Sequence, residues 1–109
     1  MEYNKYGYIR VSSKDQNVDR QITALKEVGL TGSQLYIDYQ SGKDFNRPHY
    51  QKLLQVLKQG DILYIKSIDR LGRDYDEIIE QWRYIVKKIG VDIVVIDFPL
   101  LDTREKHDG

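Results

Sequence analysis

The chain has 109 residues, of which 40% are hydrophobic, and this length and composition predict one domain with a core of its own. Its 17 Lys and Arg residues balance 17 Asp and Glu residues, and this zero net charge excludes a disordered polyelectrolyte or a generic basic nucleic-acid coat. No run of apolar residues suits a membrane span or a signal peptide. The absence of cysteine excludes disulfides and thiolate sites, and His49 and His107 are too far apart to favour a zinc cluster, so we expect a cytoplasmic protein whose chemistry uses hydroxyl, carboxylate and guanidinium groups.

The spacing of apolar residues predicts strands that alternate with helices. In the first half of the chain, Val18, Ile22, Leu25 and Val28 recur three or four positions apart, which is typical of a helix that Gly29 ends. In chain order we expect a strand over 5–11, a helix over 16–28, a strand over 34–38 and a loop over 39–47.

The second half repeats this alternation. Pro48 suits the first position of a helix, Asp74 with Glu77 can cap the next one, and Gly90 ends it. In chain order we expect a helix from Pro48 to Gly60, a strand over 61–67, a helix from Asp74 to Gly90 and a strand over 91–97. The last strand is almost continuously apolar, as a strand covered on both faces should be.

Strands that alternate with helices predict right-handed crossovers and a parallel sheet, hence an α/β fold. Such sheets bind ligands outside the carboxyl ends of their strands, so we expect the polar residues that follow the strands to gather at one edge. These residues are Arg10, Ser12, Ser13, Asp38, Ser41, Arg47, Ser67, Asp69, Arg70, Arg73 and Asp97. Guanidinium groups around a serine predict phosphoryl-type chemistry, because they stabilise the charge that develops on phosphate oxygens while an aspartate could shuttle the serine proton.

Each of these residues also has a structural interpretation. Ser12 or Ser13 could be the N-cap of the following helix, in a capping box with Asp15 or Gln16. Residues 69–74 could form a solvated turn whose exposed ion pairs contribute little.

Three further residues fit ordinary structural positions. Gly72 is expected to supply a positive φ for its turn, Asp38 fits a turn at a strand end, and His49 is expected to be exposed in a first helical turn. The constellation as a whole, and no single member of it, favours the functional interpretation.

Residues 8–16, YIRVSSKDQ, and residues 66–74, KSIDRLGRD, are the most distinctive blocks of the chain. The first is similar to the pattern Y-x-R-V-S-[ST]-x-x-Q and the second to K-x-L-D-R-L-G-R, both typical of the serine recombinases, the family of the resolvases and DNA invertases. Further matches stand in family order at Asp19-Arg20-Gln21, Asp38, Ser41-Gly42, Arg47 and Gly60-Asp61. The resemblance extends over residues 3–97.

The resemblance implies a three-layer α/β fold, with a mostly parallel sheet of four to five strands in flavodoxin-like order and helices on both faces. It also implies a reaction in which a serine attacks a DNA phosphodiester, forms a 5′-phosphoserine bond and releases a 3′-hydroxyl. Strand exchange in a tetramer and religation follow. The covalent bond conserves the phosphodiester energy, so no nucleotide triphosphate, metal or other cofactor is implied.

Carried over position by position, the resemblance makes Ser12 the nucleophile, although the adjacent Ser13 also offers a hydroxyl. The implied phosphate-binding and active-site arginines are Arg10, Arg70, Arg73 and Arg47. Asp69 is the acid beside them, as proton donor or as a group that orients arginines. The implied supporting and DNA-phosphate residues are Gln21, Asp38, Ser41 and Lys66.

Family members continue into a long helix and a DNA-binding domain. We therefore expect residues 1–97 to be the catalytic domain and residues 98–109 a connector, with double-stranded recombination-site DNA as partner and a dimer or tetramer as the full-length form. The isolated fragment is expected to be inactive. The encoding genome would be prokaryotic or that of a mobile element, and the outcome could be resolution, inversion, integration or transposition.

Two other functions stay open at this point. The chain could be a doubly wound signalling or regulatory module, phosphorylated on Asp38 or Asp69, although such domains favour an acidic pair where this chain has Arg10 to Ser13. It could also be a catalytically silent assembly fragment.

Overall fold

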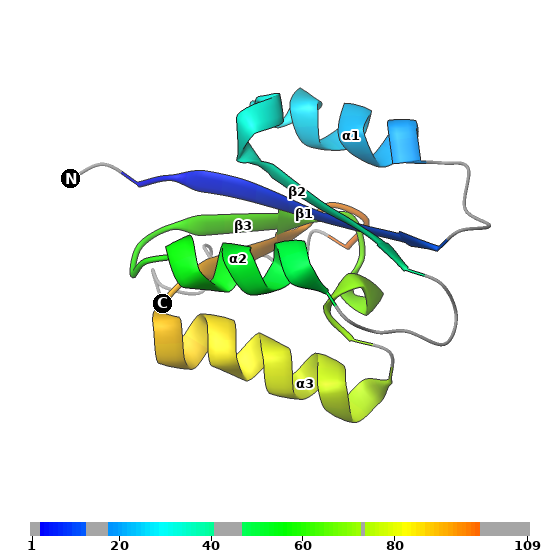
Figure 1. Ribbon diagram of the computed structural model, residues 1–109. Coiled ribbons are helices and arrows are strands. Elements are labelled where there is room, and N and C mark those ends of the chain that lie inside the picture. The colour runs from blue at the N-terminus through cyan, green and yellow to red at the C-terminus, as the bar shows by residue number, and fades with distance from the viewer. Residues whose placement is uncertain (1–2, 13–17, 41–46, 73, 99–109) are drawn as a thin grey trace.

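The computed structural model describes residues 3–12, 18–40, 47–72 and 74–98 (Figure 1). The strands are β1 (Lys5–Ser12), β2 (Leu35–Gln40), β3 (Ile62–Ile65) and β4 (Asp92–Val95). The helices are α1 (Val18–Glu27), α2 (Pro48–Val56) and α3 (Tyr75–Arg83), with 3-10 turns η1 (Gly32–Gln34) and η2 (Ile68–Leu71) and a π-helix η3 (Tyr84–Ile89) that continues α3. None of the described helices is long and apolar enough to span a bilayer.

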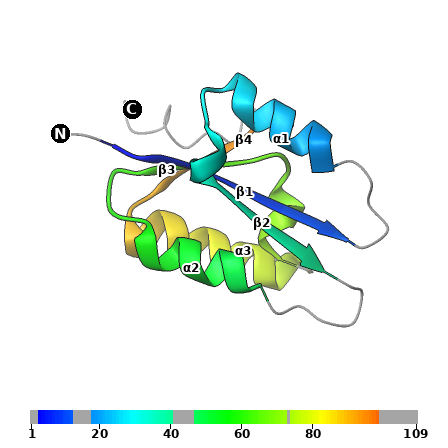
Figure 2. The same cartoon turned by 45° about the horizontal axis from the view of Figure 1, so that its top comes forward.

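Within the described residues the sheet has four strands, all parallel, in the order β2-β1-β3-β4. Helix α1 covers one face, and α2 and α3 cover the other (Figures 1 and 2). The predicted three-layer α/β fold with flavodoxin-like strand order is therefore confirmed.

Side chains alternate along β1 and divide the core into two halves. Tyr8 packs with Tyr50 and Leu53 on the face of α2 and α3, whereas Ile9 and Val11 pack beneath α1. This alternation follows from the period of two along a strand. Arg10, two positions after Tyr8, therefore lies on the same side of the sheet as α2.

Several element boundaries differ from the prediction. Tyr39 and Gln40, expected in a loop, extend β2, because β1 runs on to Ser12 and offers them the ladder partners Val11 and Ser12. Helix α2 ends at Val56, before Gly60, since Leu57 already has extended backbone angles. The two later strands are shorter than predicted, Ile62–Ile65 instead of 61–67 and Asp92–Val95 instead of 91–97.

The helix predicted from Asp74 to Gly90 is confirmed at both ends and differs in the middle. The Asp74 side chain accepts a hydrogen bond from the Glu77 main-chain nitrogen at 2.9 Å, and Gly90 ends the helical segment at φ 87°. Between them the α-helix changes into the π-helix Tyr84–Ile89, which a period of three and four does not reveal.

The prediction of a positive φ at Gly72 is wrong. Its φ is −165°, an extended value open to any residue. A Cβ atom there would lie 2.8 Å from the Ile78 main-chain nitrogen and 2.8 Å from Glu77 Cγ. Gly72 is needed because η2 runs directly against the first turn of α3.

Replacing Gly72 with alanine is therefore expected to lower the free energy of unfolding by about 1–3 kcal/mol, the usual cost of overpacking. Urea denaturation measures this change in the free energy of unfolding. Gly32→Ala is the matched control, because a Cβ at Gly32 meets nothing within 4 Å and its backbone has no positive φ. Equal free energies of unfolding for the two variants would contradict this explanation of Gly72.

Candidate active site

The strand order reverses at β1, which lies between β2 and β3. Helix α1 leads from β1 to β2 on one face, and α2 leads from β2 to β3 on the other (Figure 1). Open parallel sheets bind ligands at this switch, outside the carboxyl ends of the strands. Arg10 lies near the carboxyl end of β1 and η2 follows β3, so both border the switch point.

Arg10 connects the two central strands at this edge. Its Nη2 donates a hydrogen bond to the Asp69 main-chain oxygen at 2.6 Å, across 59 residues of sequence. Burial lowers the pKa of the Arg10 guanidinium, and the charges of Arg70 and Arg47 act in the same direction, while Tyr8 and Asp69 oppose them. Three guanidinium groups therefore share one electrostatic environment, as predicted from their positions after the strands, and guanidinium groups stay protonated in proteins.

Arg47 reaches the same turn from the start of α2. It is only 5% exposed, and its Nη1 donates to the Leu71 main-chain oxygen at 2.9 Å and to that of Arg70 at 3.4 Å. Its guanidinium carbon lies 3.9 Å from the centre of the Tyr50 ring. Arg47 is the most buried of the arginine candidates that the structure describes.

The turn η2 also carries two of the predicted residues. Asp69 is exposed, and its Oδ1 accepts a hydrogen bond from the Ser67 hydroxyl at 2.5 Å. The Arg70 Nε atom is buried and has no hydrogen-bond acceptor among the residues that the structure describes. A buried donor without an acceptor is costly to the folded state.

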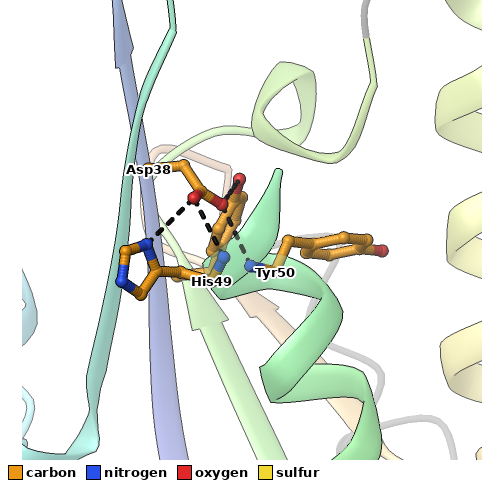
Figure 3. A network of polar contacts seen from close by, with 4 residues as sticks. Asp38, His49 and Tyr50 are labelled. Carbon is orange, nitrogen blue, oxygen red and sulfur yellow. Dashed lines mark hydrogen bonds and ion pairs between the residues drawn. The ribbon is translucent and has the colours of Figure 1, made fainter. Parts of the chain in front are cut away.

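Asp38 lies in β2 and is 1% exposed, so the expectation of a turn residue is wrong (Figure 3). Its Oδ2 accepts hydrogen bonds from the Tyr8 hydroxyl at 2.9 Å and from the Tyr50 main-chain nitrogen at 3.0 Å, and its Oδ1 accepts from the His49 main-chain nitrogen at 3.0 Å. Arg47, the N-cap residue of α2, makes no side-chain cap bond. Asp38 therefore supplies the anion that the helix N-terminus requires, from a neighbouring strand.

Three aromatic residues of this network, Tyr8, His49 and Tyr50, are not among the predicted site residues. Burial raises the pKa of the Tyr8 hydroxyl and the charge of Asp38 raises it further, so the hydroxyl remains a donor to Asp38. His49 is 53% exposed, as predicted, but its Nδ1 lies 3.1 Å from Asp38 Oδ1. For His49 and Tyr50 the signal available in the sequence is their position in the first helical turn after Arg47-Pro48. For Tyr8 it is the position two residues before Arg10, on the same face of β1.

The family described as "Resolvase, N terminal domain" matches residues 5–109. The chain belongs to the resolvase family. The resemblance to serine recombinases stated from the two sequence blocks is thereby confirmed.

This resolvase domain is 33% identical over 104 residues to the Transposon Tn3 resolvase of Escherichia coli, covering 95% of this chain and 53% of that protein. It is 39% identical over 104 residues to the R46 site-specific recombinase of Escherichia coli, covering 95% and 52%. The chain thus spans about half the length of these relatives. The crystal structure of the N-terminal catalytic domain of TP901-1 integrase matches with a TM-score of 0.68 and 26% identity, over 93% of this chain and 82% of that one.

Other predicted residues of the resolvase domain lie on α1, directly after β3 or outside the described residues. Gln21 is 2% exposed on α1, and its Oε1 has no hydrogen-bond partner in the described part of the chain. Lys66 Nζ forms an ion pair with Asp97 Oδ2 at 2.9 Å, and both side chains are partly exposed, so the pair contributes little to stability.

Ser12 is the last residue of β1, two positions beyond Arg10, and its backbone pairs with Gln40. Four groups of predicted residues lie outside the described residues: Ser13 with Asp15 and Gln16, Ser41 with Gly42, Arg73, and residues 99–109. The structure of the resolvase domain therefore assembles Arg10, Arg47, Asp69 and Arg70 at the edge where β1 ends in Ser12.

Proposed function

We propose that this domain is the catalytic domain of a site-specific serine recombinase, and that Ser12 is the residue that attacks DNA. The observation that supports this most is the hydrogen bond of 2.6 Å between Arg10 Nη2 and the Asp69 main-chain oxygen. It joins the strand that ends in Ser12 to the turn that carries Arg70. A phosphodiester near Ser12 would therefore lie among permanent positive charges.

The reaction is a transesterification. Ser12 Oγ attacks the phosphorus of a DNA phosphodiester and forms a 5′-phosphoserine bond, while the bond from phosphorus to the 3′-oxygen breaks. The 3′-oxygen leaves with a proton, so the serine hydroxyl proton is balanced by the hydroxyl of the product. Religation runs the same steps in reverse on an exchanged strand, and neither direction consumes a nucleotide triphosphate.

The arginines supply electrostatic stabilisation in this proposal. Negative charge grows on the non-bridging phosphate oxygens as the serine attacks, and donors already in position stabilise it without reorganisation. Arg70 offers its guanidinium to such an oxygen, and Arg10 and Arg47 add charge from β1 and α2. Asp69 either donates a proton to the leaving oxygen or orients the arginines.

Further parts of the proposal come from the resemblance. Arg73 and Ser41 join the site, Gln21, Asp38 and Lys66 support it, and residues 98–109 connect it to a helix and a DNA-binding domain. The partners are double-stranded recombination-site DNA and further copies of the same protein, in the cytoplasm of a prokaryote. Relatives named after transposons and an integrase are consistent with a mobile element.

The test is a protein–DNA adduct. The full-length protein is incubated with DNA carrying its recombination site and denatured, and we expect a covalent complex with one strand and a second product whose 3′-hydroxyl a polymerase can extend. Ser12→Ala is expected to remove the adduct, because alanine has no oxygen that could bond to phosphorus. Ser13→Ala is the matched control and is expected to keep it. An adduct that persists in Ser12→Ala would remove Ser12 from this role.

The signalling alternative is less well supported. A phosphoacceptor carboxylate must be accessible to its phosphodonor, whereas Asp38 is 1% exposed and both of its oxygens accept hydrogen bonds. Asp69 is exposed, but it stands beside arginines instead of a second acid. Phosphorylation of Asp69 by a small phosphodonor would revive this alternative.

A further inference from the structure

Tyr50 packs its ring against the Arg47 guanidinium. It is the third residue of α2, it is 1% exposed, and the Arg47 guanidinium carbon lies 3.9 Å from the centre of its ring. A guanidinium at this distance from a ring face is held by cation–π attraction, which strengthens when water is excluded. Arg47 is itself only 5% exposed, so this contact lies inside the protein.

The Tyr50 ring is fixed from three sides. Its hydroxyl donates to Gln81 Oε1 on α3 at 2.5 Å, and its main-chain nitrogen donates to Asp38 Oδ2 on β2 at 3.0 Å. Its ring centre lies 5.0 Å from that of Tyr8 on β1, with 55° between the planes. Burial raises the pKa of the Tyr50 hydroxyl, which therefore stays protonated and continues to donate to Gln81.

We propose that Tyr50 is a positioning residue for Arg47, holding its guanidinium between the ring face and the carbonyl groups of η2. The hydrogen bond from Arg47 Nη1 to the Leu71 main-chain oxygen, at 2.9 Å, fixes one part of the guanidinium, and the Tyr50 ring fixes the orientation of its plane. This inference rests on the proposed function, in which Arg47 acts on a DNA phosphate. It assigns a role in that site to a residue whose side chain need not touch DNA.

The first test separates the ring from the hydroxyl in the adduct assay. Tyr50→Phe keeps the ring face, and its single-turnover cleavage rate is expected to stay within about threefold of wild type. Tyr50→Leu removes the face, and we expect a rate about tenfold lower with an unchanged dissociation constant for DNA, because loss of orientation affects the reacting geometry more than binding. Leu53→Ala is the control, since it removes a fully buried side chain from the same helix; below its unfolding temperature its rate is expected to equal that of wild type.

The second test needs neither DNA nor cleavage. In the 109-residue chain labelled with nitrogen-15 arginine, the Arg47 side-chain proton resonances are expected upfield because of the ring current of Tyr50. Tyr50→Phe should keep that displacement and Tyr50→Leu should abolish it.

The outcomes are distinguishable. Equal cleavage rates for Tyr50→Phe and Tyr50→Leu, an equal loss in Leu53→Ala, or Arg47 resonances that do not respond to Tyr50→Leu would each overturn the inference. If wild-type protein forms no adduct while the Arg47 resonances respond as expected, the proposed function fails and the positioning of Arg47 by Tyr50 stands.

Discussion

Replacing Arg70 with alanine is expected to lower the rate of DNA cleavage by about 10²–10³-fold, the usual effect of removing one donor from a preorganised anion site. The free energy of unfolding is expected to change by less than about 1 kcal/mol. The hydrogen bonds of Arg70 with Ser67 and Arg47 use its main-chain atoms, which alanine keeps. The side chain beyond Cβ is lost, including the guanidinium with its buried Nε.

The measurement combines single-turnover cleavage with urea unfolding of the same preparation. Arg83→Ala is the matched control, because it removes an exposed arginine from the last turn of α3 and is expected to cleave like wild type. Arg70→Lys keeps one charge without the forked donors, and an intermediate rate is expected. Cleavage by Arg70→Ala within tenfold of wild type would contradict a role for Arg70 in stabilising the transition state.

Replacing Asp38 with alanine is expected to lower the free energy of unfolding by about 2–4 kcal/mol, because several buried donors lose their acceptor together. These donors are the Tyr8 hydroxyl and the main-chain nitrogens of His49 and Tyr50. The first turn of α2 would lose the carboxylate at its N-terminus. The backbone beside Arg47 would then be less firmly held.

Urea denaturation measures this change, with Asp69→Ala as the matched control. Asp69 is an acid of the same size, exposed at the same edge, that accepts a hydrogen bond from Ser67 only two residues away. Its removal is expected to change the free energy of unfolding by less than about 0.5 kcal/mol. A loss in Asp38→Ala no larger than that in Asp69→Ala would contradict the capping role of Asp38.

Much of the fold follows from patterns that are local in the sequence. The period of three and four in α1 reflects burial of one helix face, and the apolar runs of β3 and β4 reflect burial on both faces of the sheet. A short window of sequence contains this information. The extension of β2 through Tyr39 and Gln40 depends instead on how far β1 continues beside it. The residues around Tyr39 and Gln40 carry no information about where β1 ends.

The candidate site divides in the same way. Arg10 lies near the carboxyl end of β1, and Asp69 and Arg70 follow β3. The alternation of elements alone predicts that they meet. The roles of Asp38 and Tyr50 depend on contacts across 12 to 31 residues, from β2 to α2 and from α2 to α3. Composition and spacing suggest a turn for Asp38, and only the three-dimensional structure reveals a buried acceptor.

The most direct test of the whole account identifies the atom that becomes bonded to DNA. The denatured adduct is digested with protease and nuclease, and the modified peptide is sequenced by mass spectrometry. We expect a nucleotide joined through its 5′-phosphate to Ser12, in the peptide that contains the residues directly after Arg10. A nucleotide on Ser13 or on any other side chain, or a phosphate left on the 3′-end of the released strand, would contradict the account.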